Sequence, residues 1–231
     1  MKMNITQNAS PNKSRGRAGW SPDIIVCHIT DGAFDGSVAW ITNPASQVSY
    51  HYVIAQDGRV VQAVDIADTA WANGTNNSTD ARGNRHSRLK AVRTRQVNAN
   101  LYSVSIGFEG RHRETVGRIT NTQMEVALQL INHIRTEVLR IYSVTIPIDG
   151  EHIVGHRCIT PLWRPNCPGV HFPFNEIISS LNTPPMAIPS SWAKEAWEWA
   201  VYHNITDGTN PQGIPTREQV VQLLYNAHHA K

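Results

Sequence analysis

The stretch IVGHRCITPLWRPNCPGVHFPF, residues 153–174, is the one around which the rest of the chain is organised. It holds His156 and Cys167, eleven positions apart, with a loop rich in Pro, Arg and Trp between them. Imidazole and thiolate are the two protein groups that zinc prefers. A loop of this length can fold back and bring both side chains to one point. The stretch therefore predicts two ligands of a metal site whose third ligand lies elsewhere.

The composition is that of an ordinary folded protein. The chain has 231 residues, of which 40% are hydrophobic and 17% charged, which suits one good-sized core with a small appendage. The net charge of +3 suits an anionic polymer without identifying one. No stretch approaches the roughly 18 apolar residues of a membrane span, so we expect no membrane insertion.

Cysteine usage and the N-terminal sequence bear on localisation. The three cysteines, Cys27, Cys158 and Cys167, are an odd number and predict no disulfide framework. Reduced thiols fit a protein made in the cytosol. The first 20 residues lack the apolar run of a signal peptide, and we expect them to lie as a polar arm over the surface. We therefore expect a protein that is cytoplasmic when made.

The sequence DIIVCHIT, residues 23–30, predicts a buried strand. Alternation places His28 on one face with Val26 and Thr30, and Cys27 on the opposite face. His28 is then either a core histidine with satisfied hydrogen bonds or a site residue. Cys27 is expected to be a small buried apolar group.

The next two predicted strand regions carry further polar candidates. Residues 48–64 predict a β-hairpin around Asp57-Gly58, in which Tyr50 and Tyr52 share a face. Residues 101–110 predict another strand that ends at Glu109. A carboxylate there is costly to bury unless it is paired or functional, and the alternative is an outward-facing edge position.

A helix is predicted to follow these strands. Thr120 and Gln123 form a capping box at its start, and an apolar stripe continues from Met124 to Ile141 at helical spacing. This helix is expected to pack against the core.

Residues 72–100 are rich first in Asn and then in Arg. They predict either a solvated loop or a loop that contacts the substrate. The basic residues lack interleaved aromatic residues, so the pattern does not favour nucleic-acid binding. They are Arg82, Arg85, Arg88, Lys90, Arg93 and Arg95.

The sequence after residue 181 predicts a separate module. NTPPMAIPSS, residues 182–191, is expected to be a Pro-rich linker between a domain over residues 1–181 and a helical module over residues 192–231. Two helices of this size are too small for a robust core of their own.

Taken in order, these elements resemble the zinc-dependent N-acetylmuramoyl-L-alanine amidases of the type-2 family, which includes bacteriophage lysis amidases and peptidoglycan-recognition proteins. The resemblance runs from about residue 22 to residue 175. It implies an α/β fold with a mixed central β-sheet flanked by helices, plus the small C-terminal helical module. The motifs that carry it are IVCHIT (25–30), SYHYVIAQDG (49–58), SIGFE (105–109), GHR (155–157) and CPG (167–169).

The resemblance implies that His28, His156 and Cys167 are the ligands of Zn²⁺. Three protein ligands leave the fourth tetrahedral position for water, which is typical of a catalytic site. The residues themselves leave other ligands open, namely His152, His171 and Cys158.

The resemblance also implies catalytic roles. Tyr50 matches a tyrosine beside the metal, and Glu109 matches a carboxylate found there in some members, so either is expected to orient the water or relay its proton. Many members place Lys or Thr two residues before the third ligand. That position is Pro165 here, and Arg164 is the expected replacement as oxyanion stabiliser.

We therefore expect a hydrolase that cuts bacterial peptidoglycan between N-acetylmuramic acid and L-alanine. The expected setting is that of a phage or prophage endolysin, which acts on the cell wall after release and lyses the host. Residues 191–225 look like a single S-layer-homology repeat, which implies attachment to a secondary wall polymer or self-association. The alternatives are a non-catalytic peptidoglycan-binding protein and a nucleic-acid-binding protein.

Overall fold

The computed structural model describes residues 3–74, 81–183, 190–206 and 217–229. The chain divides into two compact units, residues 1–181 and residues 182–231. The strands of the first unit are β1 (Ile5–Gln7), β2 (Lys13–Ser14), β3 (Ile24–Ile29), β4 (Tyr52–Ile54), β5 (Val60–Gln62), β6 (Thr69–Ala70), β7 (Ser103–Phe108) and β8 (Ile153–Gly155). Its helices are α1 (Phe34–Thr42), η1 (Pro44–Ser46), α2 (Ala81–His86), α3 (Lys90–Arg95), η2 (Ala99–Tyr102), α4 (His112–Thr115), α5 (Asn121–Tyr142), α6 (His156–Ile159) and α7 (Phe174–Asn182).

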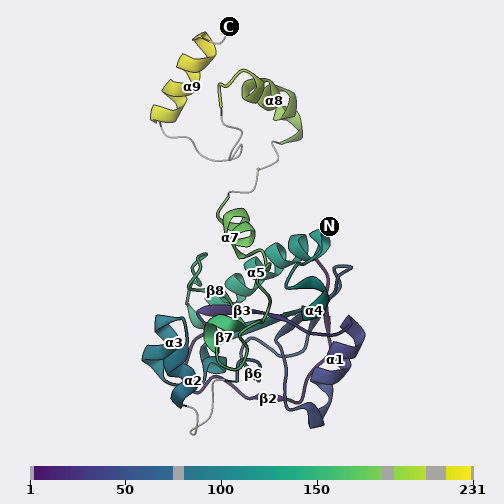
Figure 1. Ribbon diagram of the computed structural model, residues 1–231. Coiled ribbons are helices and arrows are strands. Elements are labelled where there is room, and N and C mark those ends of the chain that lie inside the picture. Colours follow the sequence, from purple (N-terminus) through teal and green to yellow (C-terminus); the bar gives the residue numbers. More distant parts are fainter. Residues whose placement is uncertain (1–2, 75–80, 184–189, 207–216, 230–231) are drawn as a thin grey trace. The chain divides into compact units, whose positions relative to one another are not determined.

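A six-stranded sheet organises the first unit, in the order β1-β5-β4-β7-β3-β8 (Figure 1). The pairs β4–β7, β7–β3 and β3–β8 are parallel, and β5–β4 is antiparallel. Strands β2 and β6 form a separate antiparallel pair. The predicted α/β fold with a mixed central sheet is confirmed.

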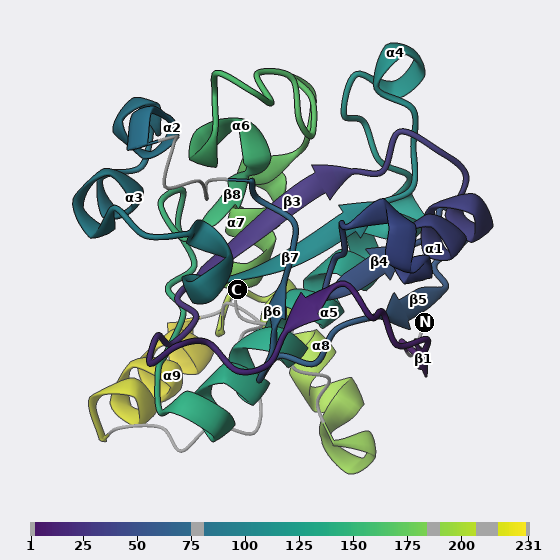
Figure 2. The same ribbon diagram turned by 90° about the horizontal axis from the view of Figure 1, so that it is seen from below.

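Helices cover both faces of this sheet. The core on one face joins β3, β4 and β7 to α5 and α7. On the other face, α3 packs against β3 and α1 packs against β4 and β5. Figure 1 shows α5 above the strands and α1, α2 and α3 lower in the view, while Figure 2 shows β3, β7 and β4 side by side.

Several local predictions are confirmed. In β3, Ile25 and Cys27 pack in the core that contains α5, and Val26 packs on the opposite face, as alternation predicts. Strands β4 and β5 form the hairpin around Asp57-Gly58. The capping box of Thr120 and Gln123 begins α5.

The N-terminal segment is mostly exposed, as expected of an arm over the surface, but it is also tied into the fold. Strand β1 joins the edge of the main sheet, paired in parallel with β5. Further along, Arg17 is only 4% exposed. Its guanidinium donates to the main-chain oxygens of Ile66, Asn100, Leu101 and Ser103. These hydrogen bonds satisfy the buried arginine and tie the N-terminal segment into the fold.

The prediction of a single long loop over residues 72–100 is also wrong in part. Residues 81–86 and 90–95 form α2 and α3, and residues 75–80 lie outside the described part. Leu89 and Val92 anchor this region in the core against β3. Two buried apolar side chains suffice to hold short helices that the polar sequence does not reveal.

The second unit contains η3 (Ser191–Ala193), α8 (Lys194–Tyr202) and α9 (Arg217–His229). Trp192 is 88% exposed and Tyr202 is 82% exposed. Residues 184–189 of the predicted linker lie outside the described part. Among the helices that the structure describes, none has the length and apolar character needed to cross a membrane.

Candidate metal centre

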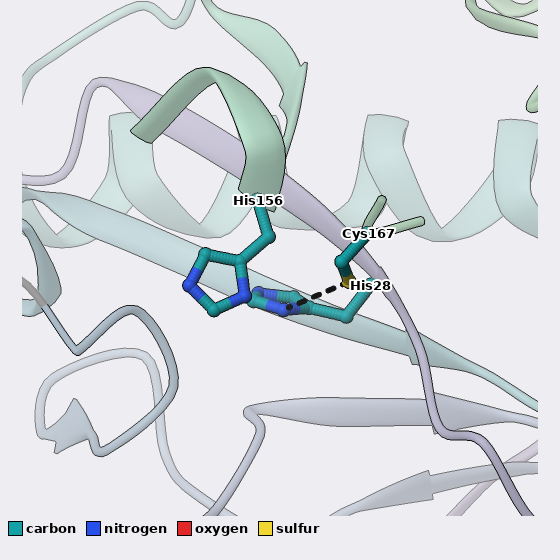
Figure 3. A group of neighbouring side chains, drawn as sticks. All are labelled: His28, His156 and Cys167. Carbon is teal, nitrogen blue, oxygen red and sulfur yellow. Dashed lines mark hydrogen bonds between the residues drawn. The ribbon is translucent and has the colours of Figure 1, made fainter. Parts of the chain in front are cut away.

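Three candidate ligands from distant parts of the sequence meet at one edge of the sheet (Figure 3). His28 is next to last in β3, and His156 follows β8 directly as the first residue of α6. Because β3 and β8 are parallel neighbours, their carboxyl ends lie at the same edge, where functional sites of α/β folds gather. Cys167 reaches this edge from the loop after α6.

The loop is fixed beside His156 by main-chain contacts. The amide of Arg157 donates to the main-chain oxygen of Cys167 over 2.8 Å. The Arg157 side chain donates to the main-chain oxygen of Gly169. At Gly155 a Cβ atom would lie 2.6 Å from Cδ of Pro168, so only glycine permits this close approach. The loop thus folds back as predicted.

The distances between the donor atoms suit a single metal ion. One donor atom from each of His28, His156 and Cys167 lies within 4.8 Å of the others. The Cys167 sulfur is 4.0 Å from Nδ1 of His28. Tetrahedral zinc with ordinary bond lengths places sulfur and nitrogen ligands roughly 3.5 Å apart. The Cys167 sulfur and Nδ1 of His28 would therefore approach each other by about 0.5 Å around an ion.

The protonation of His156 also favours a metal. Its Nε2 lies 2.9 Å from the main-chain oxygen of Asn73. A carbonyl oxygen only accepts, so Nε2 carries the hydrogen and Nδ1 presents a lone pair. Burial lowers the pKa of His156 to about 4 and that of His28 well below its ordinary value. Both imidazoles are therefore neutral near pH 7, as ligands must be.

The pKa of the Cys167 thiol is raised, whereas the pKa values of the two histidines are lowered. Burial raises its pKa to about 11, against the lowering effects of the Ile29 amide and of the charges on Arg164 and Arg157. The metal-free protein therefore holds a protonated thiol at neutral pH. Binding of a divalent ion would displace that proton.

We expect the metal-free protein to lose stability as the pH falls from about 6.5 toward about 4. The pKa values of His28, His51 and His156 are lowered from 6.5, chiefly by burial. The unfolded chain then binds more protons than the folded one in this range, so the free energy of unfolding decreases as the pH falls. Each histidine contributes a slope of up to about 1.4 kcal/mol per pH unit.

Urea unfolding of metal-free protein at several pH values in this range measures the effect. A flat free energy of unfolding would contradict the protonation states assigned to the three histidines. The variant His51→Gln removes a buried histidine outside the cluster, so its slope should be shallower than that of the wild type.

The other candidate ligands lie outside the cluster. His152 pairs with Asp149, 2.7 Å away. His171 is exposed, and the half-buried Cys158 lies in α6 facing other neighbours. Within the described residues, no other group of three potential ligands comes together in this way.

Tyr50 lies beside the cluster. Its ring centroid is 5.0 Å from that of His28, and it lines the same pocket. A Cβ atom at Gly107 would lie 2.8 Å from the Tyr50 ring, so this glycine leaves room for the tyrosine. Burial raises the pKa of Tyr50, which keeps the hydroxyl protonated and able to donate.

Arg164 and Pro165 also line the pocket. Arg164 is exposed, and its Nη1 donates to the main-chain oxygen of Trp163. Its charge lowers the pKa values of His28, His156 and Cys167, so the guanidinium lies within electrostatic reach of all three.

Glu109 is not brought into the pocket lining. One carboxylate oxygen accepts the amide of Phe34 over 2.9 Å, and the other accepts the amide of Gln56 over 2.7 Å. Phe34 begins α1, so a carboxylate here also suits the helix N-terminus. Glu109 holds α1 and the end of β4 in place.

The pocket extends beyond the residues singled out from the sequence. It has a volume of about 440 Å³ and adjoins a second one of about 680 Å³, with Trp71, Trp163 and Arg164 in both linings. Trp40, Trp71 and Trp163 are each at least 36% exposed. Exposed tryptophans gathered at a pocket indicate a ligand surface. Sequence reasoning missed them, although large aromatic residues near the predicted ligand loop were a usable signal.

Comparison with known proteins gives consistent matches. A family model described as N-acetylmuramoyl-L-alanine amidase matches residues 18–170. N-acetylmuramoyl-L-alanine amidase A of Achromobacter lyticus is 32% identical over 65 residues, which cover 28% of this chain and 37% of that protein. The chain thus matches little more than a third of that relative's length.

Solved structures share the fold. The crystal structure of a selenomethionine derivative of AmpD has a TM-score of 0.55 and 19% identity, covering 78% of this chain and 99% of that chain. The endolysin N-acetylmuramoyl-L-alanine amidase LysCS from Clostridium intestinale URNW has a TM-score of 0.51 and 19% identity, covering 78% and 97%.

Proposed function

The chain belongs to the N-acetylmuramoyl-L-alanine amidase family, and from this premise we propose that it hydrolyses peptidoglycan between N-acetylmuramic acid and L-alanine with the help of Zn²⁺. The observation that carries the proposal is the buried cluster of His28, His156 and Cys167 beneath a pocket open to solvent. The soft thiolate and two imidazoles form a donor set that suits zinc rather than magnesium or calcium. Bound there, zinc supplies a water nucleophile at neutral pH and polarises the scissile carbonyl.

The protein groups around the cluster have complementary roles in this proposal. The protonated hydroxyl of Tyr50 donates a hydrogen bond that orients the reacting groups. Among the described residues that line the pocket, Arg164 is the only lysine or arginine. Its guanidinium stabilises the negative charge that develops on the carbonyl oxygen.

The adjoining pockets suit a branched polymeric substrate. The scissile amide joins a glycan strand to a peptide, so the substrate extends away from the reacting bond in two directions. The two pockets adjoin each other and share His156, Trp71 and Trp163 in their linings. We assign the tryptophans to contacts with these two arms.

Glu109 has a supporting role in this proposal. The sequence resemblance implied direct catalysis, but both of its oxygens accept main-chain amides. It positions the segments that carry one wall of the pocket. Its assignment as a proton relay stays a prediction of the resemblance.

The main experiment is to incubate purified protein with cell walls and measure newly freed L-alanine amino groups. Release that stops with a chelator and returns with zinc supports the proposal. Release of reducing sugars would indicate a glycosidase. Binding to walls without release would favour the alternative, a non-catalytic peptidoglycan-binding protein.

Replacing Arg164 with alanine should lower kcat by roughly 100-fold or more, the usual cost of losing an oxyanion donor. Zinc binding should stay close to that of the wild type, because Arg164 is exposed and is no ligand. Single-turnover kinetics on a defined muropeptide measure the change. Arg113→Ala is a suitable control, since Arg113 is absent from both pocket linings. Near wild-type turnover of Arg164→Ala would remove this residue from the mechanism.

The biological setting follows as a finer proposal. LysCS, which shares the fold, is described as an endolysin. We assign the chain to the same role, with lysis of the host after the enzyme reaches the wall. The second unit, with its exposed Trp192 and Tyr202, would hold the enzyme on a secondary wall polymer. Loss of sedimentation with walls after that polymer is extracted would support the assignment.

A further inference from the structure

Asn73 is fully buried and contacts His156 of the cluster. Its main-chain oxygen accepts Nε2–H of His156. Its main-chain amide donates to Oδ1 of Asn100 over 2.8 Å, which fixes this part of the chain. The contact of Asn73 with His156 therefore uses the main chain and leaves the side chain available for another role.

Two buried atoms in this region have no hydrogen-bond partner among the described residues, namely Nε2 of His28 and Oδ1 of Asn73. One is a nitrogen that carries a hydrogen in one tautomer, and the other only accepts. The ring centroids of His28 and His156 are 4.5 Å apart, and Asn73 is in direct contact with His156, so the two atoms belong to one small buried region. Buried polar atoms without partners are rare and call for an explanation.

The orientation of the Asn73 amide follows from its other contact. Oγ of Ser103 donates its single hydrogen to the main-chain oxygen of Ala99 over 2.7 Å. It can therefore only accept from Asn73, 2.8 Å away, so the group facing it must be the amide nitrogen. Oδ1 of Asn73 is then the end left for another donor.

The tautomer of His28 matters for metal binding. Its Nδ1 faces Cys167 and is the end available to an ion inside the cluster. Nδ1 offers a lone pair only when the hydrogen sits on Nε2, and a buried N–H needs an acceptor. Without one, the hydrogen is better placed on Nδ1, where the Cys167 sulfur can accept it.

We propose that Asn73 is a positioning residue for both histidines: its main-chain oxygen fixes the tautomer of His156 and its side-chain oxygen fixes that of His28. Both Nδ1 atoms are then presented to the metal. This inference rests on the metal site of the proposed function. It adds that Asn73, a residue outside the ligand set, is required for metal binding. Ser103 donates to Ala99 and accepts from Asn73, and this orients the Asn73 side chain toward His28.

The test is the zinc affinity of Asn73→Leu, measured by competition with a chromophoric chelator. Leucine has a similar volume but no acceptor, and we expect the Kd for zinc to rise about 10–100-fold, as for loss of other such partners. Nitrogen NMR of the imidazoles in metal-free protein gives a second readout. His28 should carry its hydrogen on Nε2 in the wild type and shift toward Nδ1 in the variant.

Asn84→Leu is the matched control. Asn84 is also a buried asparagine with an Oδ1 lacking a partner among the described residues, but its side chain donates to the main-chain oxygen of Val97 rather than facing a ligand. Zinc affinity should be unchanged in this variant. Asn73→Asp keeps an acceptor toward His28 but loses the donor toward Ser103, and His28 should still carry its hydrogen on Nε2 in this variant, whether or not Asn73→Leu folds.

The outcomes separate the two levels of the proposal. A wild-type protein that fails to bind zinc would overturn the metal site and this inference with it. Wild-type zinc affinity and an unchanged His28 tautomer in Asn73→Leu would overturn this inference alone. A His28 that carries its hydrogen on Nδ1 in Asn73→Asp would do the same.

Discussion

Replacing Cys167 with alanine should abolish zinc binding at stoichiometric concentration and reduce amidase turnover by well over 100-fold. Loss of a group that merely supports a ligand costs about 10–100-fold in metal affinity or activity, and loss of a ligand itself should cost more. Only two histidines would remain in the cluster. Metal content by atomic absorption and release of L-alanine amino groups from walls measure the two effects.

Cys158→Ala is the natural control. Cys158 is a half-buried thiol in the same stretch, but it lies outside the cluster. Its removal should leave zinc content and turnover near those of the wild type. If Cys158→Ala lost zinc and Cys167→Ala kept it, the ligand assignment would be wrong.

Replacing Gly169 with alanine should destabilise the first unit by about 3 kcal/mol or more, from backbone strain and overpacking together. Gly169 has a φ of +132°, and a Cβ atom there would lie 2.3 Å from the main-chain oxygen of Val116. It would also lie 2.4 Å from the main-chain nitrogen of Gly117. Backbone atoms on this side cannot move away as a flexible side chain would. The free energy of unfolding from urea titrations measures the loss.

Replacing Gly36 with alanine should have the opposite effect on stability. Gly36 lies inside α1, and a Cβ atom there meets no other atom within 4 Å. Alanine should therefore raise stability by about 0.5–1 kcal/mol, because it favours the helix over the unfolded chain. Equal effects of the two substitutions would contradict the close contact at Gly169.

The sequence was most informative where local pattern and burial agree. Successive side chains of a strand point to opposite faces, which predicted that His28 and Cys27 lie on opposite faces, and β3 has that arrangement. The loop between His156 and Cys167 folds back and brings Cys167 beside His156, as its length allows. In both cases, contacts close in the sequence largely determine where the side chain lies.

The parts that escaped prediction depend on contacts far apart in the chain. Helices α2 and α3 have few apolar residues and are held by Leu89 and Val92 in a core supplied by β3. Asn73 is one of several asparagines in a polar stretch, and only the fold shows that it contacts His156. Glu109 matched a motif, yet its hydrogen bonds to Phe34 and Gln56 depend on tertiary structure.

The buried Arg17 has a practical consequence for trimming the protein. The family match begins at residue 18, so an expression boundary drawn there would remove this side chain. Four main-chain oxygens would lose their donor, those of Ile66, Asn100, Leu101 and Ser103. Asn100 and Ser103 also support Asn73. A shortened chain cut at the family boundary would therefore lose order around Asn73 and the His156 side chain that it contacts, and a boundary ahead of Ile5 is the safer choice.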